Sequence, residues 1–210
     1  MKCLMRSWPD LVNRASAAND TSPEKGALDT AGCVRILGLD PGLRHTGWGI
    51  IEARGNRLSF IADGVVEPNP KLSLAERLYV LFAGVQALVA QFAPHECAIE
   101  ETFVNKNPTS TLKLGHARAA VMLPPAAAGI LVAEYTPNLV KKSVVGAGHA
   151  EKAQVVAMMR MLLPGSRSGS EDAADALAVA VCHAHHRASA ILMGIARAGA
   201  QTKEIGGAGK

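Results

Sequence analysis

The sequence lacks the cysteine pattern of a disulfide-bonded or zinc-binding protein. Its four cysteines are scattered without a CxxC spacing, at Cys3, Cys33, Cys97 and Cys182. Cys97 and Cys182 lie inside apolar runs, as buried and reduced cysteines usually do. Because disulfides are rare in reducing compartments, the pattern favours a cytoplasmic protein.

The sequence also lacks an apolar run long enough to cross a membrane. Its longest apolar stretch, 121–133, is too short for a bilayer and contains two prolines. Near the start of the chain, Trp8, Pro9 and Asp10 stand where a secretory signal would have its apolar centre. We therefore expect no membrane partner.

Neither positive nor negative charge is strongly in excess. The 210 residues carry 22 Lys and Arg against 18 Asp and Glu, a formal net charge of +4. This balance is compatible with a polyanionic partner without requiring one. The length suits one domain with a substantial core. We expect a disordered extension over 1–33, a single domain over 34–187 and a flexible Ala/Gly-rich tail over 188–210.

Alternating and helical patterns divide the domain into strands and helices. Strands are predicted at 34–40, 45–52, 58–66, 96–101 and 130–135, and helices at 74–92, 110–122, 137–146, 151–163 and 171–186. Ser73 and Glu76 have the spacing of a capping box at the start of the first helix. Pro124 and Pro125 are expected to end the second helix. The order predicts an α/β fold with a mixed five-stranded sheet, an antiparallel meander followed by parallel strands, flanked by helices.

One carboxylate stands at a strand end beside a forced turn. Asp40 follows an apolar run, and Pro41 and Gly42 come directly after it. A carboxylate buried in mid-strand would be costly, whereas one at the strand edge can face a cleft and hold a cation. The alternative is that Asp40 only forms the turn.

Three further carboxylates stand at the edges of apolar elements. Glu100 and Glu101 close the fourth strand, and because neighbouring strand residues point to opposite faces, only one of them can share a cleft with Asp40. Periodicity does not select which. Asp172 and Asp175 lie on one face of the last helix. They can also be explained as partners of its N-terminal dipole.

Taken together, the acids predict a metal site. Like charges gathered in one cleft repel, so divalent cations are needed between them. Carboxylates without His or Cys favour Mg²⁺, with Mn²⁺ as a substitute. Two such ions would support hydrolysis of a phosphodiester by in-line attack of water, leaving 5′-phosphate and 3′-hydroxyl ends.

Six blocks in order resemble one protein family. They are LGLDPGLRHTG at 37–47, AIEETFVNKN at 98–107, LKLGHAR at 112–118, EYTPNLVKKSVVG at 134–146, AEKAQV at 150–155 and DAADALA at 172–178. Together they resemble the RuvC family of Holliday-junction resolvases. The resemblance implies a ribonuclease-H-like fold and a homodimer. It also implies paired symmetric nicking of four-way DNA junctions in recombination and repair, and partnership with a branch-migration helicase complex.

The resemblance also assigns roles to individual residues. The acids that match the family's catalytic and metal-binding positions are Asp40, Glu100, Asp172 and Asp175, so Glu100 is selected over Glu101. Lys141 and Lys152 match basic catalytic residues that contact the scissile backbone, and a compact Lys cation suits a phosphate oxygen. Phe103, with Lys106 beside it in a polar loop, matches an aromatic that stacks on bases at the junction centre. Phe103 could instead only anchor the loop.

Some features depart from the family pattern. Pro124 and Pro125 fall where a longer helix is expected, which affects the expected dimer interface if this helix forms it. His183, His185 and His186 cluster at the end of the last helix. Polar and cationic residues are ordinary at such a position, so we do not assign them to zinc.

Three other functions fit parts of the pattern. A strand followed by Asp-x-Gly and a hairpin also binds phosphate in sugar kinases and actin-like proteins, but these need two domains. A ribosomal-RNA-processing nuclease would share the fold. A DNA-binding scaffold without catalysis would have no need of all four acids.

Overall fold

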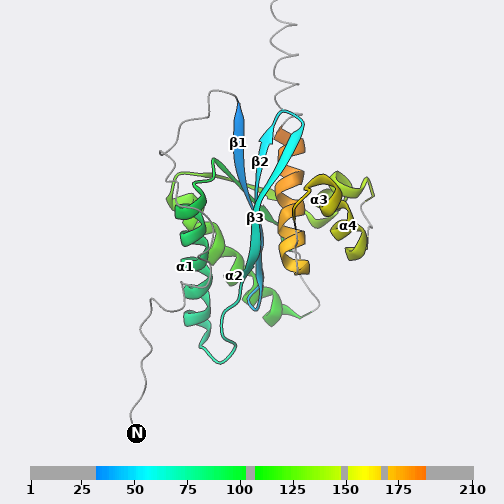
Figure 1. Ribbon diagram of the computed structural model, residues 1–210. Coiled ribbons are helices and arrows are strands. Elements are labelled where there is room, and N and C mark those ends of the chain that lie inside the picture. Colours follow the sequence, from blue (N-terminus) through cyan, green and yellow to red (C-terminus); the bar gives the residue numbers. More distant parts are fainter. Residues whose placement is uncertain (1–31, 103–106, 148–150, 167–169, 188–210) are drawn as a thin grey trace, which may run out of the picture.

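The computed structural model describes residues 32–102, 107–147, 151–166 and 170–187, which form one layered body around a five-stranded sheet (Figure 1). The strands are β1 (Cys33–Asp40), β2 (Thr46–Arg54), β3 (Arg57–Val66), β4 (Glu96–Glu100) and β5 (Leu131–Tyr135). The helices are α1 (Leu74–Phe92), α2 (Pro108–Ala127), α3 (Pro137–Val145) and α4 (Lys152–Leu162). A last helix spans the described residues 171–187. The expected segments 1–33 and 188–210 lie almost wholly outside the described residues.

The sheet has the expected mixed topology. Its strand order is β3-β2-β1-β4-β5, with antiparallel pairing between β1, β2 and β3. β4 is parallel to both β1 and β5. The two parallel strands follow helices along the chain, as a crossover connection requires. The predicted α/β class is therefore confirmed.

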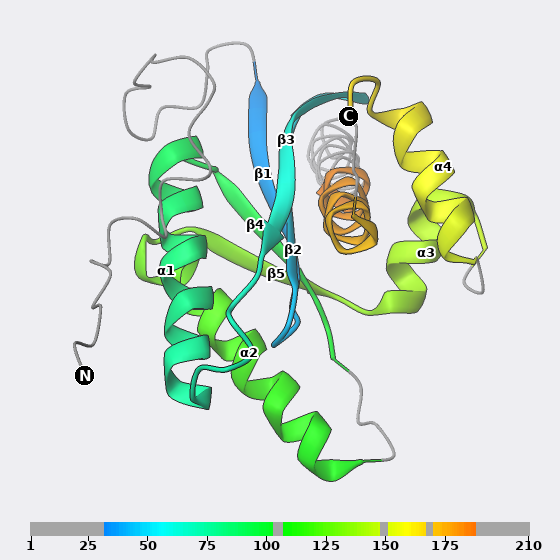
Figure 2. The same cartoon turned by 60° about the horizontal axis from the view of Figure 1, so that its bottom comes forward.

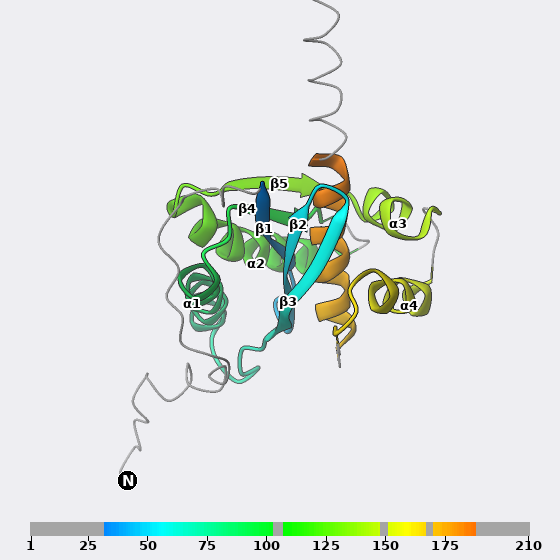
Figure 3. The ribbon, with the colours of Figure 1, turned by 45° about the horizontal axis from the view of Figure 1, so that its top comes forward.

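Alternation along the strands separates two cores. On β1, Leu37 and Leu39 pack with α1 and α2, whereas Val34 and Ile36 pack with the last helix. Figures 2 and 3 show α1 and α2 on one face of the sheet and the last helix on the other, with α3 and α4 outside it. Because side chains alternate, Gly38 and Asp40 point to the same face as Ile36. Asp40 therefore faces the last helix.

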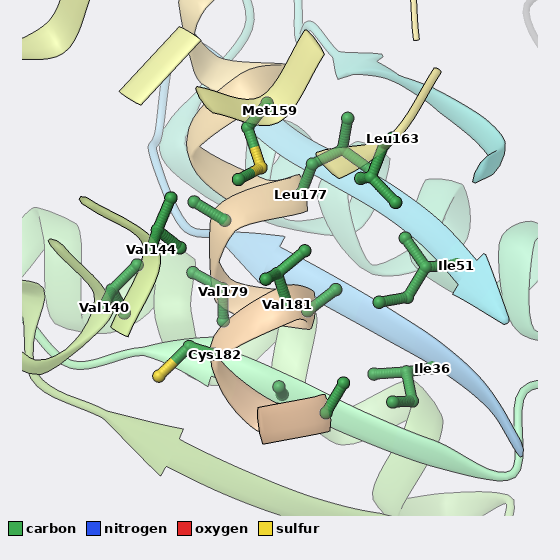
Figure 4. Close-up of a cluster of buried hydrophobic side chains, with 14 of the residues drawn as sticks. Ile36, Ile51, Val140, Val144, Met159, Leu163, Leu177, Val179, Val181 and Cys182 are labelled. Carbon is green, nitrogen blue, oxygen red and sulfur yellow. The ribbon is translucent and has the colours of Figure 1, made fainter. Parts of the chain in front are cut away.

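The last helix is buried because it is apolar on nearly all sides. Residues 176–182 are all buried, between the sheet and the α3–α4 layer. Figure 4 shows Leu177 and Val181 of this helix among Ile51 of β2, Met159 of α4 and Leu163. A helix that is apolar all round is stable only when it is enclosed in this way. The first turn of the same helix carries Asp172 and Asp175 to the edge of the sheet.

Local signals fixed several helix ends as expected. Ser73 and Glu76 form the predicted capping box of α1, with each side chain bonded to the other residue's backbone N–H. Gly146 ends α3 in the left-handed conformation, at φ 81°. Cys97 and Cys182 are free and buried, as their apolar settings predicted, whereas Cys33, expected at the end of the disordered extension, is the first residue of β1 and is also free and buried.

The prediction that Pro124 and Pro125 end α2 was wrong. The helix continues through both prolines to Ala127. Each proline removes one backbone donor, but both lie in the last turn and both rings are buried. The N–H of Ala128 lies 3.1 Å from the carbonyl oxygens of both prolines. Burial of the rings and these terminal bonds keep the helix regular beyond the point where proline alone would stop it.

Within the described residues, no helix combines the length and the hydropathy that crossing a membrane requires.

Candidate active site

Two of the predicted acids lie at the same edge of the sheet. Asp40 ends β1 and Glu100 ends β4, and these strands are parallel neighbours paired up to Leu39 and Ile99. The next residues in this register are Asp40 and Glu100. A hydrogen bond joins their carboxyl groups.

The sheet also separates Glu100 from Glu101. Ala98 packs in the core beside the last helix, whereas Cys97 and Ile99 pack against α1 and α2. By alternation, Glu100 falls on the face of Ala98 and of Asp40. The structure thus brings Glu100, and not Glu101, to Asp40.

Glycines let the last helix reach this edge. A Cβ atom added to Gly47 would collide with the carbonyl oxygen of Asp172, and one added to Gly38 would collide with that of Ala176. Glycine within a strand often marks close approach of another backbone. The helix backbone therefore rests directly on β1 and β2, and its first turn lies over the ends of these strands.

This role of the glycines was missed in the sequence. Gly47 and Gly49 lie two residues apart on β2, and Gly49 pairs with Gly38 of β1. All three glycines therefore form one strip without side chains on the face of the sheet that the last helix covers. The signal was the alternation of Gly47 and Gly49 in β2 and the presence of Gly38 in β1, together with a partner helix rich in alanine.

Burial and neighbouring negative charge raise the pKa values of several of these acids. Burial, and after it the charges of Glu100, Asp175 and Asp172, together raise the pKa of Asp40 to about 8. The pKa of Glu100 is also raised, first by burial and then by the charge of Asp175. Burial likewise raises the pKa of Asp175. Burial and mutual repulsion thus disfavour the charged forms of Asp40, Glu100 and Asp175 in the protein alone.

Both predicted lysines lie near the acids. The charges of Lys141 and Lys152 oppose the rise in the pKa of Glu100 and of Asp175. Lys141 belongs to α3, and Lys152 is the first residue of α4. The layer outside the last helix therefore delivers two cations to the carboxylate edge.

Lys152 also has a partner that the sequence analysis did not single out. Its Nζ lies 3.3 Å from Oε2 of Glu171 and 3.8 Å from Oδ2 of Asp175. The bond to Glu171 is the main cause of the raised pKa of Lys152. Because the Lys152 side chain is 60% exposed, an incoming anion can reach it.

Phe103 and Lys106, predicted to contact DNA, lie outside the described residues. The histidines of the last helix all lie within the described residues. His183 is 6% exposed, and its two ring nitrogens bond to Tyr135 and Glu96. Since both nitrogens are engaged, His183 joins the last helix to β4 and β5.

The donor set suits a hard divalent cation. Four carboxylates with no thiolate or imidazole among them match the preference of Mg²⁺ and Mn²⁺. Among the described residues, no three His, Cys, Asp or Glu side chains are close enough to hold an ion on their own. Mg²⁺ commonly keeps several waters and is bound through one or two carboxylates plus substrate phosphates. The arrangement therefore fits cations that water and a phosphate help to coordinate.

In this mixed sheet, two parallel strands end in acids at the same edge, and a helix adds two more acids to that edge. This arrangement defines a ribonuclease-H-like nuclease. Comparison with known proteins identifies the family. The model of crossover junction endodeoxyribonuclease RuvC matches residues 36–183. A RuvC of Rhodospirillum rubrum is 60% identical over 166 residues, which cover 79% of this chain and 98% of that protein.

Solved structures agree with this result. A Thermus thermophilus RuvC in complex with Holliday junction substrate matches with a TM-score of 0.70 and 31% identity, over 75% of this chain and 96% of the other. The yeast mitochondrial Holliday junction resolvase Ydc2, at 15% identity and a TM-score of 0.55 over 72% and 78% of the two chains, shares the fold. The chain belongs to the RuvC family of crossover junction endodeoxyribonucleases. This decides against the kinase-like and ribosomal-RNA-processing alternatives.

Proposed function

We propose that this protein resolves four-way DNA junctions by paired symmetric nicks, in recombination and DNA repair in the cytoplasm. The observation that carries the proposal is the meeting of four acids from three elements at one edge of the sheet, with two lysines beside them. The family assignment names the reaction class, and the carboxylate edge supplies chemistry suited to it. The product ends would be 5′-phosphates and 3′-hydroxyls.

The acids Asp40, Glu100, Asp172 and Asp175 would hold two Mg²⁺ ions, with Mn²⁺ as a substitute. When bound, such ions activate water and neutralise charge that develops on the phosphate oxygens. The raised pKa of Asp40 supports this assignment, because burial and the neighbouring carboxylates disfavour its charged form and a bound cation would offset both effects.

Lys141 and Lys152 would bind the scissile phosphate. Lys152 is held near the acids by Glu171 and Asp175, so its ammonium group is oriented before DNA arrives. A phosphodiester entering the site would exchange these carboxylate contacts for phosphate contacts. Phe103 is proposed to stack on bases at the junction centre, with Lys106 on the backbone nearby. For Phe103→Ala we expect retained metal binding and weaker cutting of intact junctions.

Paired nicks require two sites, and α2 offers a surface for a homodimer. Leu112 and Leu123 are 65% and 57% exposed, and they lie about three turns apart on nearly the same side of the helix. The continuation of α2 through its prolines keeps Leu123 in line with Leu112. Replacing both leucines with Glu is expected to convert the dimer to monomers in light scattering. Partnership with a branch-migration helicase complex remains an expectation from the family.

The function is tested with Asp40→Asn on a four-way junction and a linear duplex, with and without Mg²⁺. We expect the variant to bind the junction as the unmodified protein does, because binding depends on phosphate contacts, and to lose cutting. Glu100→Gln should behave in the same way. Its neighbour on the opposite face provides the matched control, since Glu101→Gln should cut normally.

Cutting by Asp40→Asn would remove Asp40 from the proposed ligands. A protein with all four acids that binds junctions but never cuts them would instead support the scaffold alternative.

A further inference from the structure

Arg118 of α2 links three elements behind the carboxylate edge. Its Nε donates to the carbonyl oxygen of Glu100 at 3.2 Å, and its Nη2 forms an ion pair with the carboxylate of Glu134 on β5. The Arg118 side chain is 18% exposed. It therefore lies mostly inside the protein, under the end of β4.

The bond to Glu100 acts on one particular peptide group. The Glu100 carbonyl and the Glu101 N–H belong to the same peptide plane. Arg118 holds the oxygen of this plane, while the N–H donates to the carbonyl of Tyr135 at 2.8 Å. β4 ends at Glu100, so the strand ladder does not continue beyond this point. The plane is thus held from both ends where the sheet stops.

A peptide plane held at both ends restricts the backbone angle ψ of Glu100. That angle sets the direction in which the chain leaves Glu100. It thereby also restricts the position of the Glu100 side chain relative to Asp40. We infer that Arg118 is a positioning residue, which holds Glu100 in the orientation needed to bind the cation. This inference rests on the proposed role of Glu100 as a metal ligand.

The chemistry of arginine suits this role. Its planar guanidinium presents several donors at fixed angles, so it can serve a carbonyl and a carboxylate together. Glu134 neutralises its charge and orients it, and residues that orient metal ligands from behind tune metal affinity. A lysine could reach either acceptor but has no rigid fork with which to hold both.

The chain contains a similar bridge far from the acids, which makes a matched control. Arg35 donates from Nη1 to the carbonyl oxygen of Phe92 at 2.6 Å and from Nη2 to Oε1 of Glu52 at 2.7 Å. Its side chain is 24% exposed. A merely structural role predicts that loss of either arginine lowers stability alike and leaves metal affinity unchanged.

The experiment measures Mn²⁺ binding to the full chain without DNA, by electron paramagnetic resonance titration, for Arg118→Met, Arg118→Lys, Arg35→Met and Glu100→Gln. For Arg118→Met we expect Mn²⁺ affinity to fall by about tenfold. Arg118→Lys should recover part of this loss, and Arg35→Met should bind as the unmodified protein does. The Mg²⁺ concentration for half-maximal junction cutting should rise in the same order, with metal-free junction binding unchanged.

Unaltered Mn²⁺ affinity in Arg118→Met, with loss of binding in Glu100→Gln, would overturn the positioning role and leave the proposed function intact. Unaltered affinity in Glu100→Gln would instead overturn the proposed metal site itself. If Arg118→Met does not fold, Glu134→Ala takes its place, because it keeps the cation and removes only its anchor. Normal Mn²⁺ affinity in that variant would overturn the inference.

Discussion

Nε2 of His183 lies 2.7 Å from Oε2 of Glu96, and this contact joins the last helix to the first residue of β4. The other ring nitrogen lies 2.8 Å from the hydroxyl of Tyr135, the last residue of β5. Arg187 donates to the second oxygen of Glu96 at 2.8 Å. Between these contacts and the Lys152 ion pairs at its first turn, the helix is packed by apolar side chains, whose attraction has little direction. These polar contacts therefore define its position along the sheet, and with it the position of Asp172 and Asp175.

Replacing His183 with Ala is expected to lower the free energy of unfolding by about 2 kcal/mol, because it leaves Glu96 and the Tyr135 hydroxyl without their buried partner. Urea denaturation measures this loss. His116 is exposed on α2, so His116→Ala serves as the control and should change stability by less than about 0.5 kcal/mol. Equal stability of the two variants would show that the network does not hold the helix.

The same network predicts a dependence of stability on pH. The bond from His183, followed by Arg187, lowers the pKa of Glu96 below its ordinary 4.5. A carboxylate with a lowered folded-state pKa stabilises the protein above the unfolded value, and this contribution is lost as the pH falls through the folded value. Glu96→Gln should therefore be less stable than the unmodified protein at neutral pH, and the gap should close below about pH 4.5. A gap that stays constant in acid would contradict the prediction.

Without metal, the active site should destabilise the fold. This destabilisation should grow as the pH rises, whereas the contribution of Glu96 becomes more stabilising. Burial, followed by the charges of the neighbouring carboxylates, raises the pKa of Asp40 from 3.8 to about 8. A raised pKa means that its favourable contribution is present below the unfolded value and is lost as the pH rises through the folded value. In EDTA, Asp40→Asn should therefore be more stable than the unmodified protein at about pH 8, by at least about 1 kcal/mol, and equal to it near pH 3.

Thermal unfolding across this pH range measures the difference. Added Mg²⁺ should then stabilise the unmodified protein and have no effect on Asp40→Asn, since only a bound ligand shifts the folding equilibrium. Stabilisation of both proteins by Mg²⁺ would place the cation elsewhere.

Gly47→Ala should displace the last helix, because its Cβ would collide with the Asp172 carbonyl oxygen. Neither partner can move without shifting backbone, so we expect a loss of about 3 kcal/mol in stability, with weaker Mn²⁺ binding. Gly115 on α2 has open space around it. Gly115→Ala is the control, and it should stabilise α2 by up to about 1 kcal/mol. A Gly47→Ala protein of normal stability would mean that the helix does not rest on β2.

Short-range patterns in the sequence carried much of the fold. The capping box at Ser73 and Glu76, the turn at Pro41 and Gly42 and the apolar periodicity of α1 each act over a few residues, so their outcome can be read locally. The same applies to the alternation that separates one face of a strand from the other. The prolines of α2 show the limit of such signals. Their effect on the helix depended on burial of their rings, which the local sequence does not contain.

The amino-acid order alone thus established which elements form, that acids stand at their edges, and which family the chain resembles. Tertiary structure decided which of Glu100 and Glu101 meets Asp40, that a strip of glycines admits the last helix, and that Arg118 lies behind Glu100. The reason is that strand faces are assigned only when the sheet pairs and a helix covers it. Contacts between residues remote in sequence have no local pattern until packing brings their backbones together.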